Sequence, residues 1–231
     1  MTRVSRFSKR MSTTVAGTMS IVEHVVFFKV KEETPEEKKV AMVRELNALK
    51  SLEGVLHLKA GPALRLWPSH HKLSGGFTHV LHSRYSDKAG LSAYSAHPSH
   101  VSVVEKFVKP IAEDILAMDW EARVAAPLET GFGAKRVVAC KLKDDPEKNR
   151  GKLVDRLTGK TPASAGVNFS PGRAKGFNFG ILSLVGSVDE LENPEILEGS
   201  LGSNPQVESL IVLDYASGDE RAESSESSAK M

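Results

Sequence analysis

The chain has 231 residues, of which 40% are hydrophobic and 26% are charged, and its formal net charge is +2. Such a chain can bury enough core for one large domain or two small ones without a disulfide or a metal. The near-balanced charge gives nucleic-acid binding little support, and no apolar run approaches the roughly 20 residues of a membrane-spanning helix, so neither partner is expected.

Residues 1–20 hold four basic side chains, no acidic one and many Ser and Thr. This composition is typical either of a transit peptide or of a disordered basic tail. The next segment, 21–31, is rich in β-branched and aromatic residues and predicts a strand with apolar side chains on both faces. Thr34 and Glu37 then predict a capping box for a helix that ends near Gly54, since Val and Leu recur between them at helical spacing.

The same alternation of elements continues to residue 122. We expect short strands at 55–60, 76–85 and 115–120, a loop at 61–75, and helical stretches over 87–96 and 98–108. The resulting order, strand–helix–strand–strand–helix–strand, is the ferredoxin-like pattern of an antiparallel sheet with helices on one face. Its opposite face would stay bare, and an apolar bare face needs a partner sheet.

Residues 133–217 repeat this order in outline and can supply that partner. Strands are expected at 135–143, 175–185 and 208–215, and helices at 145–157 and 188–197. The residues that align are His24 with Arg136, Phe77 with Phe177, and Asp119 with Asp214. Their separation shrinks along the chain as loops shorten, which is the pattern of two diverged copies of one domain.

We therefore predict an α+β protein of two tandem ferredoxin-like (βαββαβ) domains, packed sheet to sheet like a dimeric α/β-barrel but within one chain. Whether two chains then form a homodimer stays open. The expected divisions are 1–20 for the basic segment, 21–122 for the first domain, 123–132 for a linker, 133–217 for the second, diverged domain and 218–231 for a disordered tail.

The tail ends in Ala229-Lys230-Met231, which is similar to the Ser-Lys-Leu peroxisomal signal. A receptor could reach this tripeptide, because a tail rich in Ser and Glu is expected to be flexible. We predict a peroxisomal location. An organelle reached through the basic N-terminal segment, or the cytoplasm, are the alternatives.

Several segments together resemble the stress-responsive A/B barrel family. They are VEHVVFFKVK at 22–31, GGFTHVLHSRY at 75–85, AYSAHPSHVSVVEKFVKPI at 93–111 and DW at 119–120. The first repeat resembles the family along its length, and the second only in outline, as in two-domain plant members, some of which are regarded as peroxisomal. The resemblance implies a dimeric α/β-barrel architecture and an association with stress, and for most members no reaction is known.

One branch of this family contains polyketide cyclases that fold a linear tetraketide into an aromatic acid. The resemblance maps their pocket histidines and helix tyrosine onto His24, His79, His97, His100 and Tyr94. Their catalytic pair is a first-helix tyrosine and the histidine matched by His100. Here the first-helix position falls near Leu46, which lacks the hydroxyl that holds the reacting carbonyl. This departure argues against the cyclase reaction but not against the pocket.

The strand histidines also have a purely structural interpretation. His24 and His79 have apolar neighbours on the same face, so each can be a buried histidine that is hydrogen-bonded to its surroundings. Alternatively, both edge a cavity between the sheets and the second helix. The second repeat has Arg136 and Phe179 at these positions, so the scaffold does not need the histidines.

His97 and His100 flank Pro98 at a spacing that places both rings on one side of a helical turn. His97 can cap a helix, and His100 can face solvent or pair with Glu105. The functional alternative is that His100 is a pocket base, because a neutral imidazole accepts a proton near physiological pH.

Metal binding stays open, since several histidines can hold zinc or copper, although the sequence has no His-Glu-x-x-His motif and no cysteine pair. The single cysteine, Cys140, fits a reducing compartment and a small core position on a strand. His70 and His71 lie in a polar segment, where exposure is expected. No cofactor is predicted.

We therefore expect a stress-response protein that binds a small apolar molecule in a pocket of the first domain, without established catalysis. His24, His79, Tyr94 and His97 are its predicted ligand-binding residues. The alternative is a cofactor-free enzyme, cyclase-like or oxygenase-like, with His100 as the general base. A third hypothesis is a structural stress protein whose barrel only stabilises an assembly.

Overall fold

The computed structural model of the chain describes residues 17–125, 133–143, 145, 146, 148, 164–191, 193, 199 and 204–216. The predicted C-terminal peroxisomal signal and almost all of the predicted basic segment lie outside these residues. Most of the helices expected at 145–157 and 188–197 also lie outside them. These predictions stay predictions.

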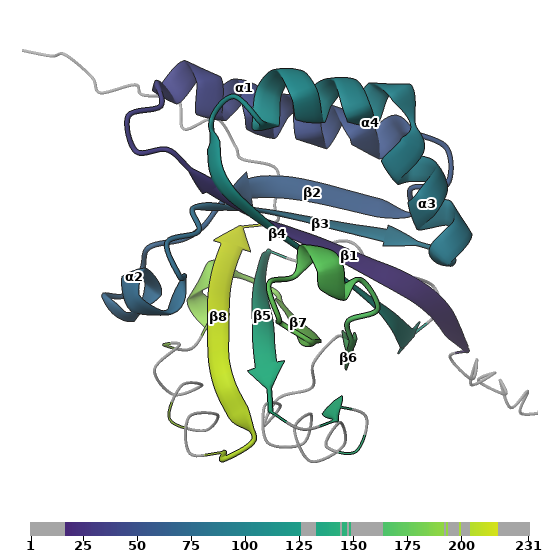
Figure 1. The fold of residues 1–231 in the computed structure, drawn as a ribbon, viewed down its shortest axis with the longest axis vertical. Coiled ribbons are helices and arrows are strands. Elements are labelled where there is room, and N and C mark those ends of the chain that lie inside the picture. Colours follow the sequence, from purple (N-terminus) through teal and green to yellow (C-terminus); the bar gives the residue numbers. More distant parts are fainter. Residues whose placement is uncertain are drawn as a thin grey trace, which may run out of the picture.

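The first half of the chain forms a four-stranded antiparallel sheet with helices on its outer face (Figure 1). The strand order is β2-β3-β1-β4. The strands are β1 (Thr18–Val30), β2 (His57–Pro62), β3 (His79–Tyr85) and β4 (Ala112–Ala125). The helices are α1 (Glu36–Ala48), α2 (Ser69–Leu73), α3 (Lys88–Ala96) and α4 (Pro98–Val103), with the 3-10 turn η1 (Leu49–Ser51) after α1 and the π-helical turn η2 (Val104–Val108) after α4.

Two local predictions are wrong. The α1 helix begins at Glu36 and has no side-chain cap hydrogen bond, so the predicted capping box of Thr34 is absent. The backbone N–H of Thr34 instead donates to Lys31, and its side chain is buried. The segment 61–75 is not only a loop, because α2 lies within it and packs Leu73 against the second half of the chain.

The second half forms a sheet with the same strand arrangement, in the order β6-β7-β5-β8. Its strands are β5 (Ala134–Leu142), β6 (Ser164–Val167), β7 (Phe179–Val185) and β8 (Val207–Ala216), with 3-10 turns η3 (Pro171–Arg173) and η4 (Val188–Glu190). The aligned pairs of the sequence analysis occupy matching places. His24 lies opposite Asp119 in the first sheet, as Arg136 lies opposite Asp214 in the second.

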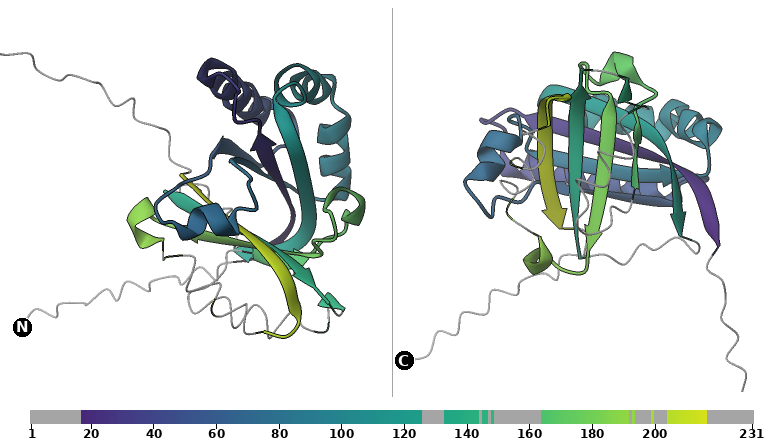
Figure 2. Two further views of the ribbon diagram at one scale, coloured as in Figure 1. Left: turned by 60° about the vertical axis from the view of Figure 1, so that its left-hand side comes forward. Right: turned by 90° about the horizontal axis from the view of Figure 1, so that it is seen from below.

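The two sheets pack face to face, with the helices α1, α3 and α4 on the far side of the first sheet (Figures 1 and 2). The shared core combines side chains of both sheets, among them Val25, Phe27, Leu116 and Trp120 from the first and Val137, Leu182, Leu213 and Tyr215 from the second. Burying both apolar faces confirms the predicted α+β fold of two ferredoxin-like sheets.

Trp120 is the largest side chain that is fully buried in this contact. Its indole ring lies against a glycine pair, Gly166 and Gly180, which are direct neighbours on β6 and β7. A Cβ atom at Gly180 would lie 2.5 Å from the indole ring, and one at Gly166 would lie 2.8 Å from it. Bare backbone at both positions is therefore what lets the tryptophan fit.

A cluster of charged groups is also buried between the sheets. The carboxylate of Glu23 accepts hydrogen bonds from Arg84, from Nε2 of His82 at 2.6 Å and from the Ser164 hydroxyl at 2.8 Å. The ammonium of Lys135, from the second half, lies 3.3 Å from Nδ1 of His82. No local pattern in the sequence indicates this cluster, because its members alternate with core residues along their strands.

Burial sets the protonation of this cluster. It lowers the pKa of His82 to about 4, and the charge of Lys135 contributes to the shift. It also lowers the pKa of Lys135 to about 7, with help from the charge of Arg84. For Glu23, burial would raise the pKa, but the charges and hydrogen bonds of His82 and Arg84 outweigh it and bring the pKa to about 2.

Each half also sends a connecting segment across to the last strand of the other. The backbone N–H of Phe169 donates to the carbonyl of Asp119 on β4, and that of Leu64 donates to the carbonyl of Asp214 on β8. These paired crossings join the edges of the two sheets. Among the described residues, no helix is long and apolar enough to cross a membrane.

The glycine pair gives a first prediction. Replacing Gly180 by Ala should destabilise the protein by about 1–3 kcal/mol, because the new methyl group would overlap the Trp120 ring. Urea unfolding followed by circular dichroism measures the effect. The control is Gly172→Ala, where no atom lies within 4 Å of the new Cβ. Equal midpoints for the two variants would contradict the contact.

The ionic cluster gives a prediction for pH. Below its usual value of 6.5 and down to about 4, His82 binds a proton in the unfolded chain but not in the folded one. The free energy of unfolding should therefore fall as pH drops through this window, and Glu23 should extend the loss from 4.5 towards 2. The urea midpoint should be lower at about pH 5 than at about pH 7.

The variant His82→Gln should reduce this dependence, because an amide can donate to Glu23 without titrating. Some dependence should remain, since burial also lowers the pKa of His57 and of His79. The control is His71→Gln, which removes an exposed histidine on α2. An unchanged difference between the two pH values in His82→Gln would show that this histidine is not the titrating group.

Candidate functional site

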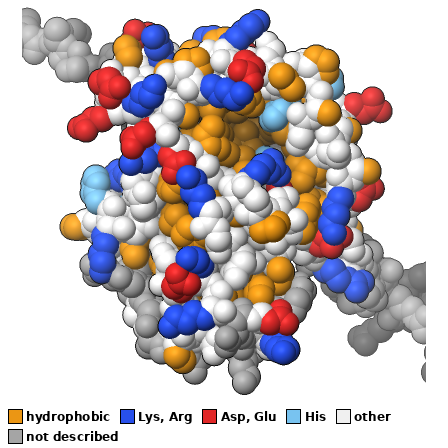
Figure 3. Space-filling view, in the orientation of Figure 1, with side chains coloured by type: hydrophobic (Ala, Val, Ile, Leu, Met, Phe, Trp, Pro, Cys, Tyr) orange, Lys and Arg blue, Asp and Glu red, His pale blue; other side chains and the backbone are white. Residues whose placement is uncertain are grey.

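A cavity of about 470 Å³ lies between the first sheet and the helices that cover it. Its apolar walls come from the strands and from α1 and η2, and include Val26, Phe28, Leu46, Leu81, Val104, Val108, Ile115 and Ala117. Its polar lining consists of His24, Tyr94, Ser95, His100, Arg173 and Lys175. Figure 3 shows an apolar hollow with basic and histidine side chains at its rim. The prediction that the cavity lies between the two sheets is therefore wrong. Side chains of the shared core fill that space, and the cavity lies on the helix-covered face of the first sheet.

The roof of this cavity contains a π-helical turn. The α4 helix continues into η2, and Val104 and Val108, at the two ends of η2, both line the cavity. A π-turn inserts an extra residue into a helix and shifts the side chains that follow it, and such turns are frequent at functional sites. Here the turn directs two small aliphatic side chains towards the sheet.

His24 lies on β1 directly opposite Asp119 on β4. Its Nδ1 atom is 2.5 Å from a carboxylate oxygen of Asp119, which is fully buried. Burial would raise the pKa of Asp119, but the hydrogen bond and charge of His24, with Ser170 and Arg173, lower it overall. An ionised carboxylate at Nδ1 holds the proton on that nitrogen, so Nε2 is the ring atom left to accept a proton at the cavity wall.

Tyr94 and His100 complete a group of three rings. The ring centroids of Tyr94 and His100 are 4.7 Å apart, and those of Tyr94 and His24 are 6.4 Å apart. Nδ1 of His100 donates to the carbonyl of Ser95 at 2.9 Å, which leaves its Nε2 without a partner among the described residues. Burial lowers the pKa of His100, so this imidazole is neutral at physiological pH.

The Tyr94 hydroxyl is a proton donor rather than a nucleophile. Burial raises the pKa of Tyr94 well above its usual value, with a hydrogen bond from Tyr85 opposing the shift. The Tyr85 hydroxyl is in turn 2.9 Å from that of Ser83. The hydroxyls of Ser83 and Tyr85 therefore orient the hydroxyl of Tyr94, and Tyr94 lines the cavity.

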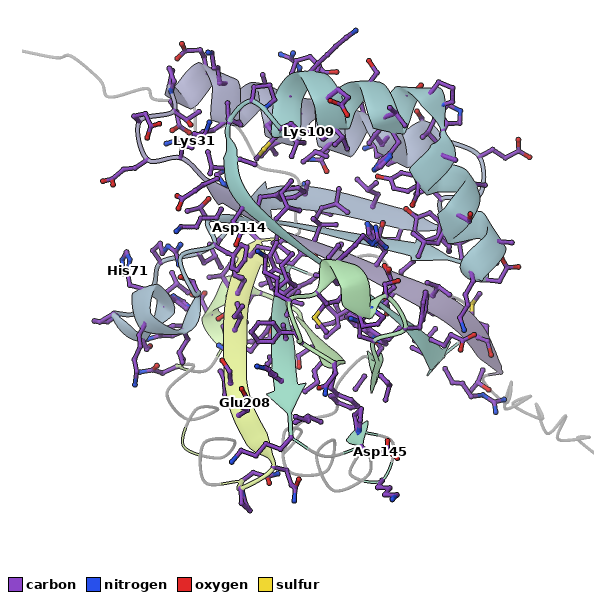
Figure 4. All side chains as sticks on the ribbon, in the orientation of Figure 1. Lys31, His71, Lys109, Asp114, Asp145 and Glu208 are labelled. Carbon is purple, nitrogen blue, oxygen red and sulfur yellow. The ribbon has the colours of Figure 1, made fainter. Side chains whose placement is uncertain are left out.

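Two basic residues of the second half reach this cavity of the first. Arg173, at the end of η3, donates to the second carboxylate oxygen of Asp119 at 2.5 Å. Lys175 forms an ion pair of 2.8 Å with Asp114, which is labelled on β4 in Figure 4. Lys175 adopts a left-handed backbone conformation, with φ at 51°. The crossing segment that carries Phe169 brings both cations here.

The structure places the predicted site residues in two groups. His24, Tyr94 and His100 lie together at the cavity. His79 and His97 are not among its lining residues. His79 lies near α1 and contacts the Thr78 hydroxyl at 2.9 Å, with its pKa lowered to about 4, mainly by burial. His97 is exposed and caps α4 by accepting from the N–H of Ser99.

The second half has a related arrangement with different chemistry. Asp214 binds the guanidinium of Arg136 where Asp119 binds His24. Asp214 also binds a histidine of the first half, because Nε2 of His70 lies 3.0 Å from its carboxylate. The expectation that His70 is exposed is therefore wrong, because α2 folds it against β8, whereas His71 is exposed as expected.

Sequence reasoning missed Asp119, Arg173 and Lys175 as members of the site. In the sequence, Asp119 was noted only because it aligns with Asp214. The pairing register of β1 and β4 is what places it opposite His24. The two cations come from the other half, so no local spacing indicates them. Within the described residues, no group of three or more His, Cys, Asp or Glu side chains could hold a metal ion.

Comparison with known proteins identifies the family. The model of the Stress responsive A/B Barrel Domain matches residues 22–122. A stress-response A/B barrel domain-containing protein of Arabidopsis thaliana is 36% identical over 214 residues, which cover 84% of this chain and 78% of that protein. A second protein of the same plant, also described as stress-response A/B barrel domain-containing, is 39% identical over 183 residues, with coverages of 75% and 84%.

Among solved structures, a protein of Fusobacterium nucleatum with the provisional name monooxygenase has a similar fold. Its TM-score is 0.54 at 13% identity, and the match covers 87% of this chain and 94% of that one. This likeness supports the arrangement of both sheets and says nothing about activity. Because both plant relatives are more than one third identical over most of their length, the chain belongs to the stress-response A/B barrel domain family.

Proposed function

We propose that this protein binds a small, mainly apolar molecule in the cavity between the first sheet and its helices. The observation that carries the proposal is the combination of aliphatic walls with a few convergent polar groups, which is the usual composition of a ligand site. Its volume also falls within the usual range for such sites. His24, Tyr94 and His100 supply the polar contacts that would orient the ligand.

A matched pair of valines on α4 and η2 tests this. Val104 lines the cavity, whereas Val101, about one turn earlier, is exposed. The variant Val104→Phe should weaken binding of the neutral fluorescent probe N-phenylnaphthylamine by about tenfold or more, because the larger ring takes up the ligand's space. Titration followed by probe fluorescence measures the affinity.

The variant Val101→Phe is the control, since it adds the same ring outside the cavity and should bind like the parent protein. Thermal unfolding of both variants checks that the fold is kept. Equal affinities of the two variants, or no binding by the parent protein, would refute the proposal.

A second candidate function is general-base catalysis on a carbon acid, and the His24–Asp119 pair favours it. A buried carboxylate that fixes the tautomer of a histidine lining an apolar cavity is a common arrangement for taking a proton. This assignment makes His24 the base. The sequence-based alternative named His100, whose one hydrogen bond among the described residues is to a backbone carbonyl.

The substrate nitrobenzisoxazole tests this candidate, because removal of its ring C–H proton breaks the N–O bond and releases a coloured cyanophenolate. The protein should exceed free imidazole by about 10²–10⁴-fold. His24→Gln and Asp119→Asn should both remove the excess, since the first lacks the base and the second loses the fixed tautomer. His79→Gln, outside the cavity, should leave it intact. A larger loss in His100→Gln than in His24→Gln would assign the base to His100.

A further inference from the structure

We propose that the second half of the chain gives this cavity a binding site for an anionic head group, so that the ligand is an amphipathic carboxylate. This inference rests on the proposed function, because it names the chemical class of the molecule in the same cavity. It differs from the sequence-based expectation of a purely apolar ligand, which considered only residues of the first half.

The charges that line the cavity are all of one sign. Its described lining contains two charged side chains, Arg173 and Lys175, and no acidic one, and the imidazole of His100 is neutral. Asp119 and Asp114 hold the two cations in place, but neither belongs to the lining. An anion at the rim would therefore meet donors and no opposing carboxylate.

Arg173 can bind its carboxylate partner and a ligand together. Its only described ion pair joins one terminal nitrogen to Asp119. A guanidinium has five N–H donors in a fixed fork, of which this contact uses a minority. The side chain is 52% exposed, whereas Asp119 is fully buried. The buried carboxylate orients the guanidinium, and the remaining donors can bind a ligand carboxylate.

Lys175 is unusual because of its backbone. Its left-handed conformation, with φ at 51°, normally favours glycine, and the matching position of the first half is Gly75, with φ at 59°. A non-glycine residue in this region carries a conformational cost, and such residues concentrate at ligand-binding sites. Glycine would satisfy the backbone here, so a requirement for the lysine side chain at the rim accounts for its presence.

The walls of the cavity require the rest of the ligand to be apolar. Apolar side chains of β1, β3, β4, α1 and η2 make up more than half of the lining, and the basic groups come from η3 and the residues just after it. A molecule with a hydrocarbon body and one terminal carboxylate matches both parts. An inorganic anion could bind the basic side chains but has no group for the apolar walls. A long-chain alcohol could fill the apolar part but carries no charge for the basic side chains.

Displacement of N-phenylnaphthylamine by paired competitors tests the proposal. Decanoate and decan-1-ol have the same hydrocarbon chain and differ in the charge of the head group. Decanoate should compete about tenfold better than the alcohol, the effect of one charge-assisted contact. Acetate and inorganic phosphate should compete weakly, because neither has a hydrocarbon body.

Three variants locate the effect. Arg173→Gln and Lys175→Gly should each reduce the preference for decanoate and leave the affinity for decan-1-ol unchanged, while Arg173→Lys should retain part of it. Lys175→Gly relieves the left-handed backbone but also removes the ion pair with Asp114, so thermal unfolding of the variant checks that the fold is kept. The matched control is Lys29→Gln, which removes a 2.8 Å ion pair with Glu113, also near the start of β4, but does not line the cavity.

The outcomes separate this inference from the proposed function. Equal competition by decanoate and decan-1-ol would overturn the anionic site and leave the apolar site standing. A preference for decanoate that survives in both Arg173→Gln and Lys175→Gly would also overturn it. Failure of the parent protein to bind the probe would overturn both proposals.

Discussion

The contact between two apolar sheet faces determines where the other parts of this molecule lie. Hydrophobic burial has no direction, so it can bring the sheets together without fixing how they align. Trp120 against the bare backbone of Gly180, and Glu23 with its donors from both halves, are each satisfied by one alignment only. Once this alignment is set, the connecting segments of each half must cross to the other.

Because of these crossings, both halves contain a buried aspartate at the same strand position, and the side chains that it binds differ between the halves. Asp119 and Asp214 lie at equivalent strand positions, and each binds one side chain on the neighbouring strand and one from the opposite half. In the second half the neighbouring strand supplies Arg136, which stays charged at all physiological pH values. In the first half it supplies the imidazole of His24. Each carboxylate therefore binds one histidine and one arginine, but the histidine comes from the neighbouring strand in the first half and from the opposite half in the second. Among the described residues, His82 has partners at both ring nitrogens between the sheets, whereas His24 and His100, which line the cavity, each have a hydrogen-bond partner at Nδ1 alone.

By itself, the sequence determined the fold class and the order of the strands along the first half, but it missed β6 in the second half. The resemblance grouped His24, Tyr94 and His100, together with His79 and His97. Periodicity and turn residues are local signals, and the resemblance of the first half covers these positions. The second half contributed the alignment of Asp119 with Asp214, which pointed to a shared structural position. Segment 61–75 was the main local error, because α2 and the buried His70 depend on contacts with β8.

Only the tertiary structure decided which face of the first sheet holds the cavity, why His79 and His97 lie away from it, and which residues complete it. Side-chain alternation along β1 offers two apolar faces, and nothing local says which one the second sheet covers. Arg173 and Lys175 come from a segment well beyond β4 in the sequence. Their position follows from the packing of whole sheets, and spacing along the chain does not encode such a long-range contact.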